Sequence, residues 1–283
     1  MSASILITGI NGPAGGSVLK YFKGAGFSSV IGTDVREAGN SADRFYLVPE
    51  ALNPVYPETL LNIIKKERPA LFIPTVSEEL ALVAGLKKEI NREGTAVFIS
   101  GVREVEIAND KFRTAEFMER CGVPVPRTFD GTVDKEAVLK EIGLPVLVKP
   151  KFSRGGRGVE VYGEAAELLA DKRKEAVVQE FVPGQGFDVN LFIDGEGALR
   201  SSVLLKKMRV DDGPEGRAFE VERVEDGLEE VTDVGVRAAK SLGLTGPLHF
   251  DIRLKADGSP VLLEINARVG RNISHSLEVL DSL

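Results

Sequence analysis

The sequence predicts an α/β protein with two differently built parts. In the first hundred residues, short apolar strands alternate with helices, which is typical of a parallel sheet covered by helices. These elements are expected at residues 5–8, 15–23, 30–34, 57–67, 71–74, 78–91 and 96–100. After residue 122, consecutive strands are joined by tight, glycine-rich loops, which favours an antiparallel sheet.

Length and charge narrow the range of functions. A chain of 283 residues has room for about two domains with a core each. Its net charge of −7 argues against a general surface for nucleic acid or anionic membranes. No apolar run approaches the roughly 20 residues that span a bilayer. The start, MSASILITG, has neither the basic residues nor the long apolar stretch of a signal peptide. We therefore expect a cytoplasmic protein with no membrane or nucleic-acid partner.

The segment ILITGINGPAGGSVLKYFKGAGFSSVIGTDV, residues 5–35, has the order strand, glycine-rich turn, helix and strand. Its glycines could let a phosphate approach the helix N-terminus, and Asp34 could bind a ribose hydroxyl, as in dinucleotide-binding enzymes. Alternatively, the glycines only let the helix pack closely on the sheet. Because their spacing is loose, the pattern alone favours this second, structural interpretation.

The most informative segment is LHFDIRLKADGSPVLLEINARVGRN, residues 248–272. Asp257-Gly258 predicts a two-residue turn that pairs Ala256 with Ser259, and Asp251 then lies opposite Glu264. Side chains alternate along a strand, so one face is wholly apolar and is expected in the core: Phe250, Ile252, Leu254, Val261, Leu263 and Ile265. The other face carries His249, Asp251, Arg253, Leu262, Glu264 and Asn266.

Two carboxylates opposite each other on a sheet repel unless a cation lies between them. Asp251, Glu264 and the amide of Asn266 supply hard oxygen ligands, which suit Mg²⁺ together with phosphate oxygens. The alternative is a solvated face on which Arg253 neutralises the acids. The strand pattern alone does not decide between the two.

Two arginines that follow the hairpin favour the metal and phosphate site. Arg268 and Arg271 lie in NARVGRN, directly after the candidate metal ligands. Planar guanidinium groups suit the oxygens of a phosphate or a carboxylate. The acidic strand and the arginines together predict a site for a phosphorylated ligand and its metal ion.

With these residues in place, the chain resembles the ATP-grasp superfamily. The likeness is greatest to the ATP-binding halves of the carbamoyl-phosphate synthetase large subunit and its short stand-alone relatives. It covers nearly the whole chain and rests on segments in the family's order. These are NDKFRTAEFMERCGVPVPRTF, LPVLVKP, SRGGRGV, VVQEFVPG and LLEINARVGR.

The resemblance implies a Rossmann-like amino-terminal domain over residues 1–108, followed by a two-lobed α+β ATP-grasp domain over residues 109–283. The small lobe spans about residues 127–182, and the ATP-grasp domain is expected to be incomplete at its C-terminus. ATP, with Mg²⁺ or Mn²⁺, is expected between the two lobes.

The resemblance also implies roles for particular residues. Two lysines hold the phosphates and the adenine side of ATP, a mobile glycine-rich loop closes over the phosphates, and a hinge strand binds adenine through its backbone. These residues are Lys111, Lys149, Ser153, Gly155, Gly156, Gly158, Glu180, Phe181 and Val182. One or two Mg²⁺ ions are held by Asp251, Glu264 and Asn266. The arginines that hold an acyl-phosphate intermediate correspond to Arg268 and Arg271.

Three features depart from the family's pattern. PGQGF replaces PGEEY, so Gly186 stands where a carboxylate usually binds the ribose hydroxyls, and Asp188 is the expected substitute. NAR replaces NPR, which keeps Arg268. The chain ends at Leu283, soon after the hairpin, whereas relatives usually continue. Part of the substrate-binding surface is therefore expected to be missing.

The predicted function is an ATP-dependent carboxylate–amine ligase. A small-molecule carboxylate, or bicarbonate, is activated as an acyl phosphate, and an amine or similar nucleophile displaces the phosphate. The expected partners are these small molecules, and a homodimer is an allowed assembly. Two alternatives stay open: a non-catalytic ATP-binding subunit or fragment and, less favoured, an NAD-dependent oxidoreductase.

Overall fold

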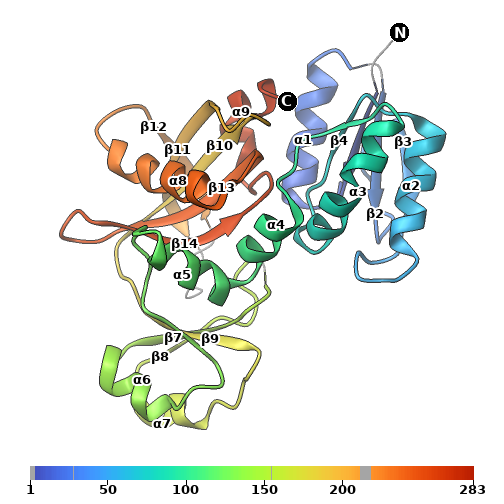
Figure 1. Ribbon diagram of the computed structural model, residues 1–283. Coiled ribbons are helices and arrows are strands. Elements are labelled where there is room, and N and C mark those ends of the chain that lie inside the picture. The colour runs from blue at the N-terminus through green and yellow to red at the C-terminus, as the bar shows by residue number, and fades with distance from the viewer. Residues whose placement is uncertain (1–3, 28, 154, 211–217) are drawn as a thin grey trace.

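The computed structural model describes residues 4–27, 29–153, 155–210 and 218–283, and it confirms the α/β fold class. Three sheets follow one another along the chain (Figure 1). The first is five-stranded and parallel, the second four-stranded and antiparallel, and the third five-stranded and antiparallel. No helix among the described residues is long and apolar enough to cross a membrane.

The parallel sheet is covered on both faces. Its strands, in the spatial order β3-β2-β1-β4-β5, are β1 (Ser4–Thr8), β2 (Ser29–Asp34), β3 (Arg44–Leu47), β4 (Leu71–Ile73) and β5 (Ala96–Val97). Helix α1 (Pro13–Gly24) packs on the face that carries Ile5 and Ile7. Helices α2 (Tyr56–Glu67) and α3 (Leu80–Arg92) pack on the face of Leu6 and Ile31. Both faces of β1 are therefore apolar, as a doubly covered parallel sheet requires.

The elements expected in this part are present, with shifts of a few residues at their ends. The strand expected at residues 96–100 is shorter, and the helix expected at 78–91 begins with the 3-10 turn η1 (Ser77–Glu79). Strand β3 was not predicted. Its exposed ends, Arg44 and Leu47, lie at the sheet edge, where the apolar pattern of a buried strand is absent.

The middle lobe has its own small core. Its strands, in the order β6-β9-β7-β8, are β6 (Thr128–Asp130), β7 (Val146–Pro150), β8 (Glu160–Tyr162) and β9 (Ala176–Glu180). Helices α6 (Lys135–Ile142) and α7 (Ala165–Ala170) complete it. The core consists of Val138, Val146, Val148, Leu168, Ala176 and Val178. The expected glycine-rich connection joins β7 to β8, and its Arg154 lies outside the described residues.

The third sheet is also covered on both faces. Its strands, in the order β12-β11-β10-β13-β14, are β10 (Gln185–Ile193), β11 (Leu199–Val210), β12 (Ala218–Val224), β13 (Gly246–Leu254) and β14 (Pro260–Asn266). One core includes residues of α4 (Val102–Asn109), α5 (Lys111–Arg120) and α8 (Glu229–Leu242). On the opposite face, η2 (Ile273–His275) and α9 (Leu277–Asp281) pack between this sheet and α1 (Figure 1).

The β13–β14 hairpin turns differently from the prediction. The amide of Lys255 donates to the carbonyl of Ser259 at 3.0 Å, so the loop comprises residues 256–258 rather than two residues. A register shift between Asp251 and Ile252 accommodates one additional residue in β14. The two differences cancel, and Asp251 lies opposite Glu264 as predicted.

The same shift corrects the predicted faces of the hairpin near its turn. Leu262 pairs with Ile252 and is buried in the core, although it was expected on the polar face. Leu263 lines a cavity beside Glu264, although it was expected in the core, whereas Val261 is buried as expected but pairs with Arg253. A β-bulge reverses the alternation of the residues on one side of it, which accounts for these two errors.

The glycine-rich turn after β1 is tightly packed. A Cβ atom on Gly15 would lie 2.3 Å from the carbonyl oxygen of Gly9 and 2.8 Å from the Cα of Ile10. Both contacts are with backbone, which cannot move aside as a flexible side chain can. The Asp34 carboxylate accepts hydrogen bonds from the amides of Asn11 and Arg36, at 3.0 and 3.3 Å. These contacts give Gly15 and Asp34 a structural role.

We expect Gly15→Ala to lower the free energy of unfolding by about 1–3 kcal/mol, as overpacking does. Gly16→Ala is the matched control, because the Cβ would lie 3.8 Å from its nearest neighbour in the same helix. It should be neutral or stabilise by up to about 1 kcal/mol, since alanine favours helix. Urea unfolding of both variants checks this, and equal stabilities would contradict it.

A buried glutamate ties the ends of β1 and β4 to α2. The side chain of Glu79 is fully buried and accepts hydrogen bonds from the hydroxyls of Thr8 and Tyr56. The amide of Val76 donates to the same carboxylate at 3.2 Å. Burial raises the pKa of Glu79 to about 7, although these hydrogen bonds act to lower it.

This raised pKa predicts a specific pH dependence of stability. Unfolded glutamate loses its proton near pH 4.5, whereas folded Glu79 keeps it to about pH 7, so the folded state binds more protons between these values. The contribution of Glu79 is complete below pH 4.5 and is lost as the pH rises through about 7.

We expect the stability of wild type relative to Glu79→Gln to fall from pH 5 to pH 7, by up to about 1.4 kcal/mol per pH unit. Urea unfolding at several pH values measures the difference, with Glu119→Gln at an exposed position of α5 as control. A difference that stays constant with pH would show that Glu79 does not titrate in this window.

Candidate active site

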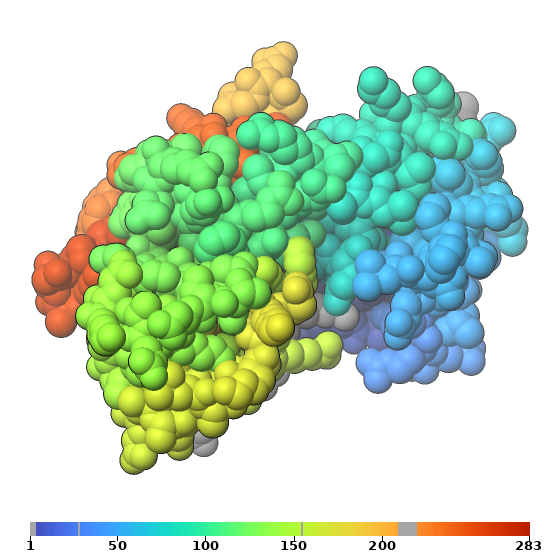
Figure 2. Space-filling model, turned by 60° about the horizontal axis from the view of Figure 1, so that its bottom comes forward, coloured from blue at the N-terminus to red at the C-terminus, as the bar shows by residue number. Residues whose placement is uncertain are grey.

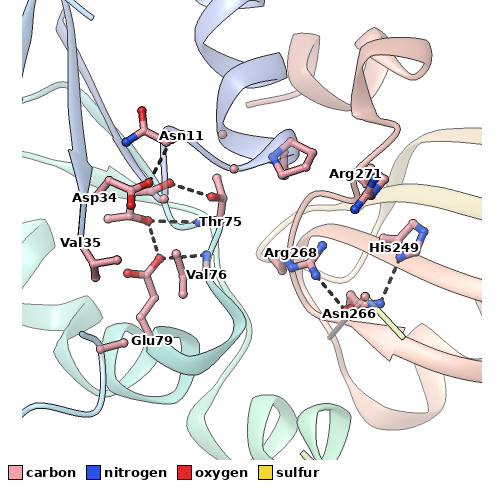
Figure 3. A pocket seen from close by; sticks show the side chains of 18 of the residues that line it. Asn11, Asp34, Val35, Thr75, Val76, Glu79, His249, Asn266, Arg268 and Arg271 are labelled. Carbon is pink, nitrogen blue, oxygen red and sulfur yellow. Dashed lines mark hydrogen bonds between the residues drawn. The ribbon is translucent and has the colours of Figure 1, made fainter. Parts of the chain in front are cut away.

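A cavity of about 450 Å³ lies between the parallel sheet and the third sheet. One wall comprises the glycine-rich turn and the ends of β2 and β4, where ligands of open parallel sheets commonly bind. The other wall comprises parts of β10, β11, β13 and β14 and the segment after β14. Figure 3 shows Asp34 and Glu79 on one side of this main cavity and Arg268, Arg271 and His249 on the other. Figure 2 shows a hollow between the N-terminal part (blue) and the middle lobe (green to yellow).

A smaller cavity lies between the middle lobe and the third sheet. Residues expected at the adenine side of ATP line it: Lys149, Glu180, Phe181 and Val182. The two carboxylates of the hairpin, Asp251 and Glu264, line both this cavity and the main one. The structure therefore brings the predicted nucleotide residues and the predicted metal ligands to one junction.

The two hairpin carboxylates face lysines from different elements. Lys207 on β11 places its Nζ 2.8 Å from Asp251 Oδ2, and Lys111 places its Nζ 3.5 Å from Glu264 Oε1. Burial alone would raise the pKa of Glu264, but the positive charges of Lys111, Lys149 and Arg268 outweigh burial and lower it. Glu264 is therefore ionised at neutral pH and can attract a cation.

The donor set at this junction fits a hard divalent cation. Asp251, Glu264 and Asn266 together offer two carboxylates and one amide oxygen, the ligands that Mg²⁺ and Mn²⁺ prefer. Among the described residues there is no group of three His, Cys, Asp or Glu side chains suited to a metal. The amide of Asn266 is thus needed to complete a three-ligand set.

Asn266 also connects two side chains that line the main cavity. Its Oδ1 accepts from Arg268 Nη2 at 3.1 Å, and its Nδ2 lies 3.1 Å from His249 Nδ1 (Figure 3). Arg268 further donates to the hydroxyl of Ser77 at 3.3 Å and to the carbonyl of Val269 at 2.7 Å. These bonds fix the guanidinium plane across the main cavity, which Arg271 also lines.

Lys111 links the glycine-rich loop to the hairpin. Asp110 caps helix α5 by accepting from the amides of Phe112 and Arg113, at 2.9 and 3.1 Å, and this cap orients the first residue, Lys111. The Lys111 ammonium donates to the carbonyl of Ser153 at 2.9 Å in addition to its contact with Glu264. One buried lysine thus contacts both the loop and a predicted metal ligand.

The glycine-rich loop needs its glycines for conformational reasons. Gly155, Gly156 and Gly158 have φ angles of +60°, +71° and +73°, in the left-handed region that favours glycine. A Cβ on Gly158 would also lie 3.0 Å from Pro150 Cγ. Gly155 and Gly156 line the main cavity, so the loop reaches from the middle lobe to the wall that carries the arginines.

The hinge strand is held from both sides. Glu180 Oε2 accepts from the amide of Arg127 at 3.2 Å, and the carbonyl of Val182 accepts from Arg253 Nη1 at 3.3 Å. Arg253 is therefore turned toward the hinge strand. Lys207 is the cation in contact with Asp251, which corrects the alternative in which Arg253 neutralises the acids.

Asp188 lies on the wall of the main cavity and is almost fully buried. Its carboxylate lies 3.3 Å from Lys207 Nζ and 3.2 Å from His249 Nε2, and it accepts from Asn272 Nδ2 at 2.8 Å. Burial acts to raise the pKa of Asp188, but Lys207 and His249 outweigh burial and hold it well below its usual range. These contacts engage both oxygens, so they do not support the predicted role of Asp188 at the ribose.

Sequence reasoning missed Lys207, Asn272 and Glu79 at this site. Strand alternation predicted that His249 lies on the same face of the hairpin as Asp251 and Glu264, but it assigned no role to His249. The available signal for Lys207 was a pair of lysines in the apolar run VLLKKM. Which lysine faces the acids depends on the pairing of β11 with β10, which no local motif specifies.

Two family models match the chain. Residues 108–271 match the ATP-grasp domain, and residues 5–98 match the PylC-like N-terminal domain. Among curated proteins, the carbamoyl phosphate synthase large chain of Clostridium perfringens (strain 13 / Type A) is 24% identical over 240 residues, which are 80% of this chain. The chain spans 22% of the length of that relative.

Solved structures share the fold at low sequence identity. The L-amino acid ligase of Bacillus licheniformis has a TM-score of 0.75 at 18% identity, over 97% of this chain and 69% of that one. The N5-carboxyaminoimidazole ribonucleotide synthetase of Thermotoga maritima has a TM-score of 0.69 at 20% identity, over 99% and 76%.

A third similar structure is a nucleotide complex. The biotin carboxylase domain dimer of Hydrogenobacter thermophilus 2-oxoglutarate carboxylase, with MgADP and bicarbonate, has a TM-score of 0.72 at 19% identity, over 96% of this chain and 66% of that one. The family match over residues 108–271 covers more than half of the sequence. The chain therefore belongs to the ATP-grasp family.

Proposed function

We propose that this chain is an ATP-dependent carboxylate–amine ligase. It activates a small-molecule carboxylate, or bicarbonate, as an acyl phosphate for attack by an amine or similar nucleophile. The observation that carries the proposal is that Asp251, Glu264 and Asn266 line the main cavity together with Arg268 and Arg271, and that the two carboxylates also line the smaller cavity. The ligase and synthetase names of its relatives support the same reaction class.

In this proposal the smaller cavity, about 30 Å³ in this structure, widens to take the adenine side of ATP. Lys149 and the hinge residues Glu180, Phe181 and Val182 line it. Lys111 and the glycine-rich loop then lie toward the phosphates, because Lys111 contacts both the loop and Glu264. Mg²⁺ or Mn²⁺ on Asp251, Glu264 and Asn266 would supply charge neutralisation of the phosphate oxygens.

The proposed reaction needs no covalent intermediate on the protein. An oxygen of the substrate carboxylate attacks the γ-phosphorus, and ADP leaves. The amine then attacks the acyl carbon, phosphate leaves, and the nitrogen loses a proton. The chain contributes positioning and preorganised positive charge, as in phosphoryl transfer generally. Arg268, held by Ser77 and Asn266, is oriented to bind the group in transfer.

The main cavity is the proposed place for the carboxylate and the amine. It joins the metal ligands to the wall formed by the glycine-rich turn, so a substrate there could reach the γ-phosphate. The same proposal places the N-terminal domain at residues 1–108 and the ATP-grasp domain at 109–283, with a small lobe near 127–182. A homodimer belongs to it as well, since the Hydrogenobacter thermophilus domain is described as a dimer.

The first alternative is a non-catalytic ATP-binding subunit or fragment. The observation in its favour is that the chain spans only 22% of the carbamoyl phosphate synthase large chain. The NAD-dependent oxidoreductase is less well supported. Gly15 packs against backbone at the turn, and Asp34 accepts two backbone hydrogen bonds in place of a ribose hydroxyl.

We expect Mg-ATP to raise the melting temperature of the protein, and NAD to leave it unchanged. The reason is that the residues expected at the adenine side line the smaller cavity, whereas Gly15 packs against backbone and Asp34 already accepts two backbone hydrogen bonds. Thermal shift measurements with ATP, with ATP plus Mg²⁺, and with NAD distinguish an ATP-binding protein from an NAD-binding one. Stabilisation by NAD alone would overturn the nucleotide assignment.

Arg268→Lys tests whether the chain is an enzyme. Lysine keeps the charge but loses the planar two-pronged grip. If the guanidinium binds the transferring group mainly in the transition state, Arg268→Lys should raise the activation free energy by about 2–4 kcal/mol. Turnover should fall accordingly, and the affinity for ATP should stay nearly unchanged.

The assay is phosphate release from ATP, screened over amino acids, other small acids and bicarbonate, with ATP affinity measured by calorimetry. Arg120→Lys is the control, because Arg120 is an exposed helix arginine paired with Glu116. Equal turnover in wild type and Arg268→Lys removes Arg268 from the mechanism. Absence of phosphate release in wild type with every acid favours the non-catalytic alternative.

A further inference from the structure

A buried lysine is shared between two carboxylates at the candidate metal site. Lys207 has a side chain only 8% exposed, with its Nζ 2.8 Å from Asp251 Oδ2 and 3.3 Å from Asp188 Oδ1. Asp188 and Asp251 are direct partners in the β10–β13 ladder, so both point to the same face. The ammonium therefore lies between two acids, only one of which is a candidate metal ligand.

The glycine that departs from the family's pattern makes room for this lysine. A Cβ on Gly186 would lie 3.0 Å from Lys207 Cδ and 3.7 Å from its Cβ and Cγ. The stem of Lys207 thus runs over Gly186 to reach the acids. Gln185 Nε2 donates to the carbonyl of Lys207 at 2.7 Å, which ties the two strands together at this point.

The two carboxylates differ in how they are held. The Asp188 side chain is 4% exposed and has further contacts with His249 and Asn272. The Asp251 side chain is 23% exposed and lines both cavities. Asp188 is a fixed, buried anion, whereas Asp251 is open to an incoming cation.

We propose that Lys207 is a built-in counter-cation that competes with the divalent metal for Asp251. Without metal, its ammonium neutralises Asp251. When the metal binds, the ammonium moves to Asp188, which is already within 3.3 Å. Two cations on one carboxylate repel strongly in a partly buried site, so metal affinity depends on this transfer. The inference rests on the proposed function, because the metal is the one that accompanies ATP.

The proposal predicts opposite effects for the two partners of the transfer. Removing the ammonium, in Lys207→Met, should tighten metal binding, because Asp251 loses its competitor. Removing the alternative anion, in Asp188→Asn, should weaken it, because Lys207 keeps Asp251 as its main partner. Changes to groups behind metal ligands typically shift affinity about 10–100-fold, and we expect each effect to be at least about tenfold.

The experiment is a Mn²⁺ titration of the full chain, in which electron paramagnetic resonance measures free Mn²⁺, with and without a non-hydrolysable ATP analogue. Lys206→Met is the matched control, since the neighbouring lysine points to the other face of the strand. Lys207→Gln is a second variant, because its amide can still donate to the buried acids if the methionine variant does not fold. Circular dichroism checks the fold of each.

Tighter binding in the Lys207 variants and weaker binding in Asp188→Asn support the transfer. If wild type binds Mn²⁺ and all variants match it, or both changes act in the same direction, the counter-cation role is wrong and the ligase proposal stands. If ATP binds but wild type takes up no Mn²⁺ with the analogue, the metal assignment of the proposed function fails, and this inference fails with it.

Discussion

Two carboxylates held opposite each other across β13 and β14 impose the constraint on which the site depends. Asp251 and Glu264 repel, so the fold must bring positive charge to both. Lys207 comes from β11 and Lys111 from the start of α5, more than ninety residues apart in the sequence. The attraction of these lysines to the two carboxylates, as well as apolar packing, therefore holds the elements of the site together. In the proposed function, a divalent cation would take over part of the positive charge that the lysines supply.

The register of this hairpin shows how far sequence reasoning reaches. The alternating pattern and the Asp257-Gly258 signal correctly predicted that Asp251 opposes Glu264. The turn itself was wrong, and the register shift beside Asp251 compensated for the error. A turn signal specifies register only to within about one residue, and no residue type in this strand indicates a bulge. The misassigned faces of Leu262 and Leu263 follow from that single missing fact.

Residues in recognisable motifs were easier to predict than residues that contact those motifs only through tertiary structure. The hinge strand, the glycine-rich loop and the arginines were predicted from local segments; the hinge strand lines the smaller cavity, and the loop and the arginines line the main one. Lys207 could not be found in this way, because its role arises from the pairing of β10 with β11 and from the space above Gly186. The prediction that Asp188 binds the ribose was made without knowledge of the β10–β11 pairing, which brings Lys207 to this carboxylate.

The hydrophobic cores divide the chain differently from its motifs. One core joins the parallel sheet to β10 and β13, and another joins α1 to the end of the chain. The core of the middle lobe contains residues of that lobe alone. By this division of the cores, we expect the chain to unfold as two cooperative units, one comprising the two five-stranded sheets and one comprising the middle lobe. Opening the smaller cavity would therefore expose little of any core, whereas widening the main cavity would disrupt two. In the proposed function, nucleotide would then enter and leave while the opposing walls of the main cavity keep their spacing.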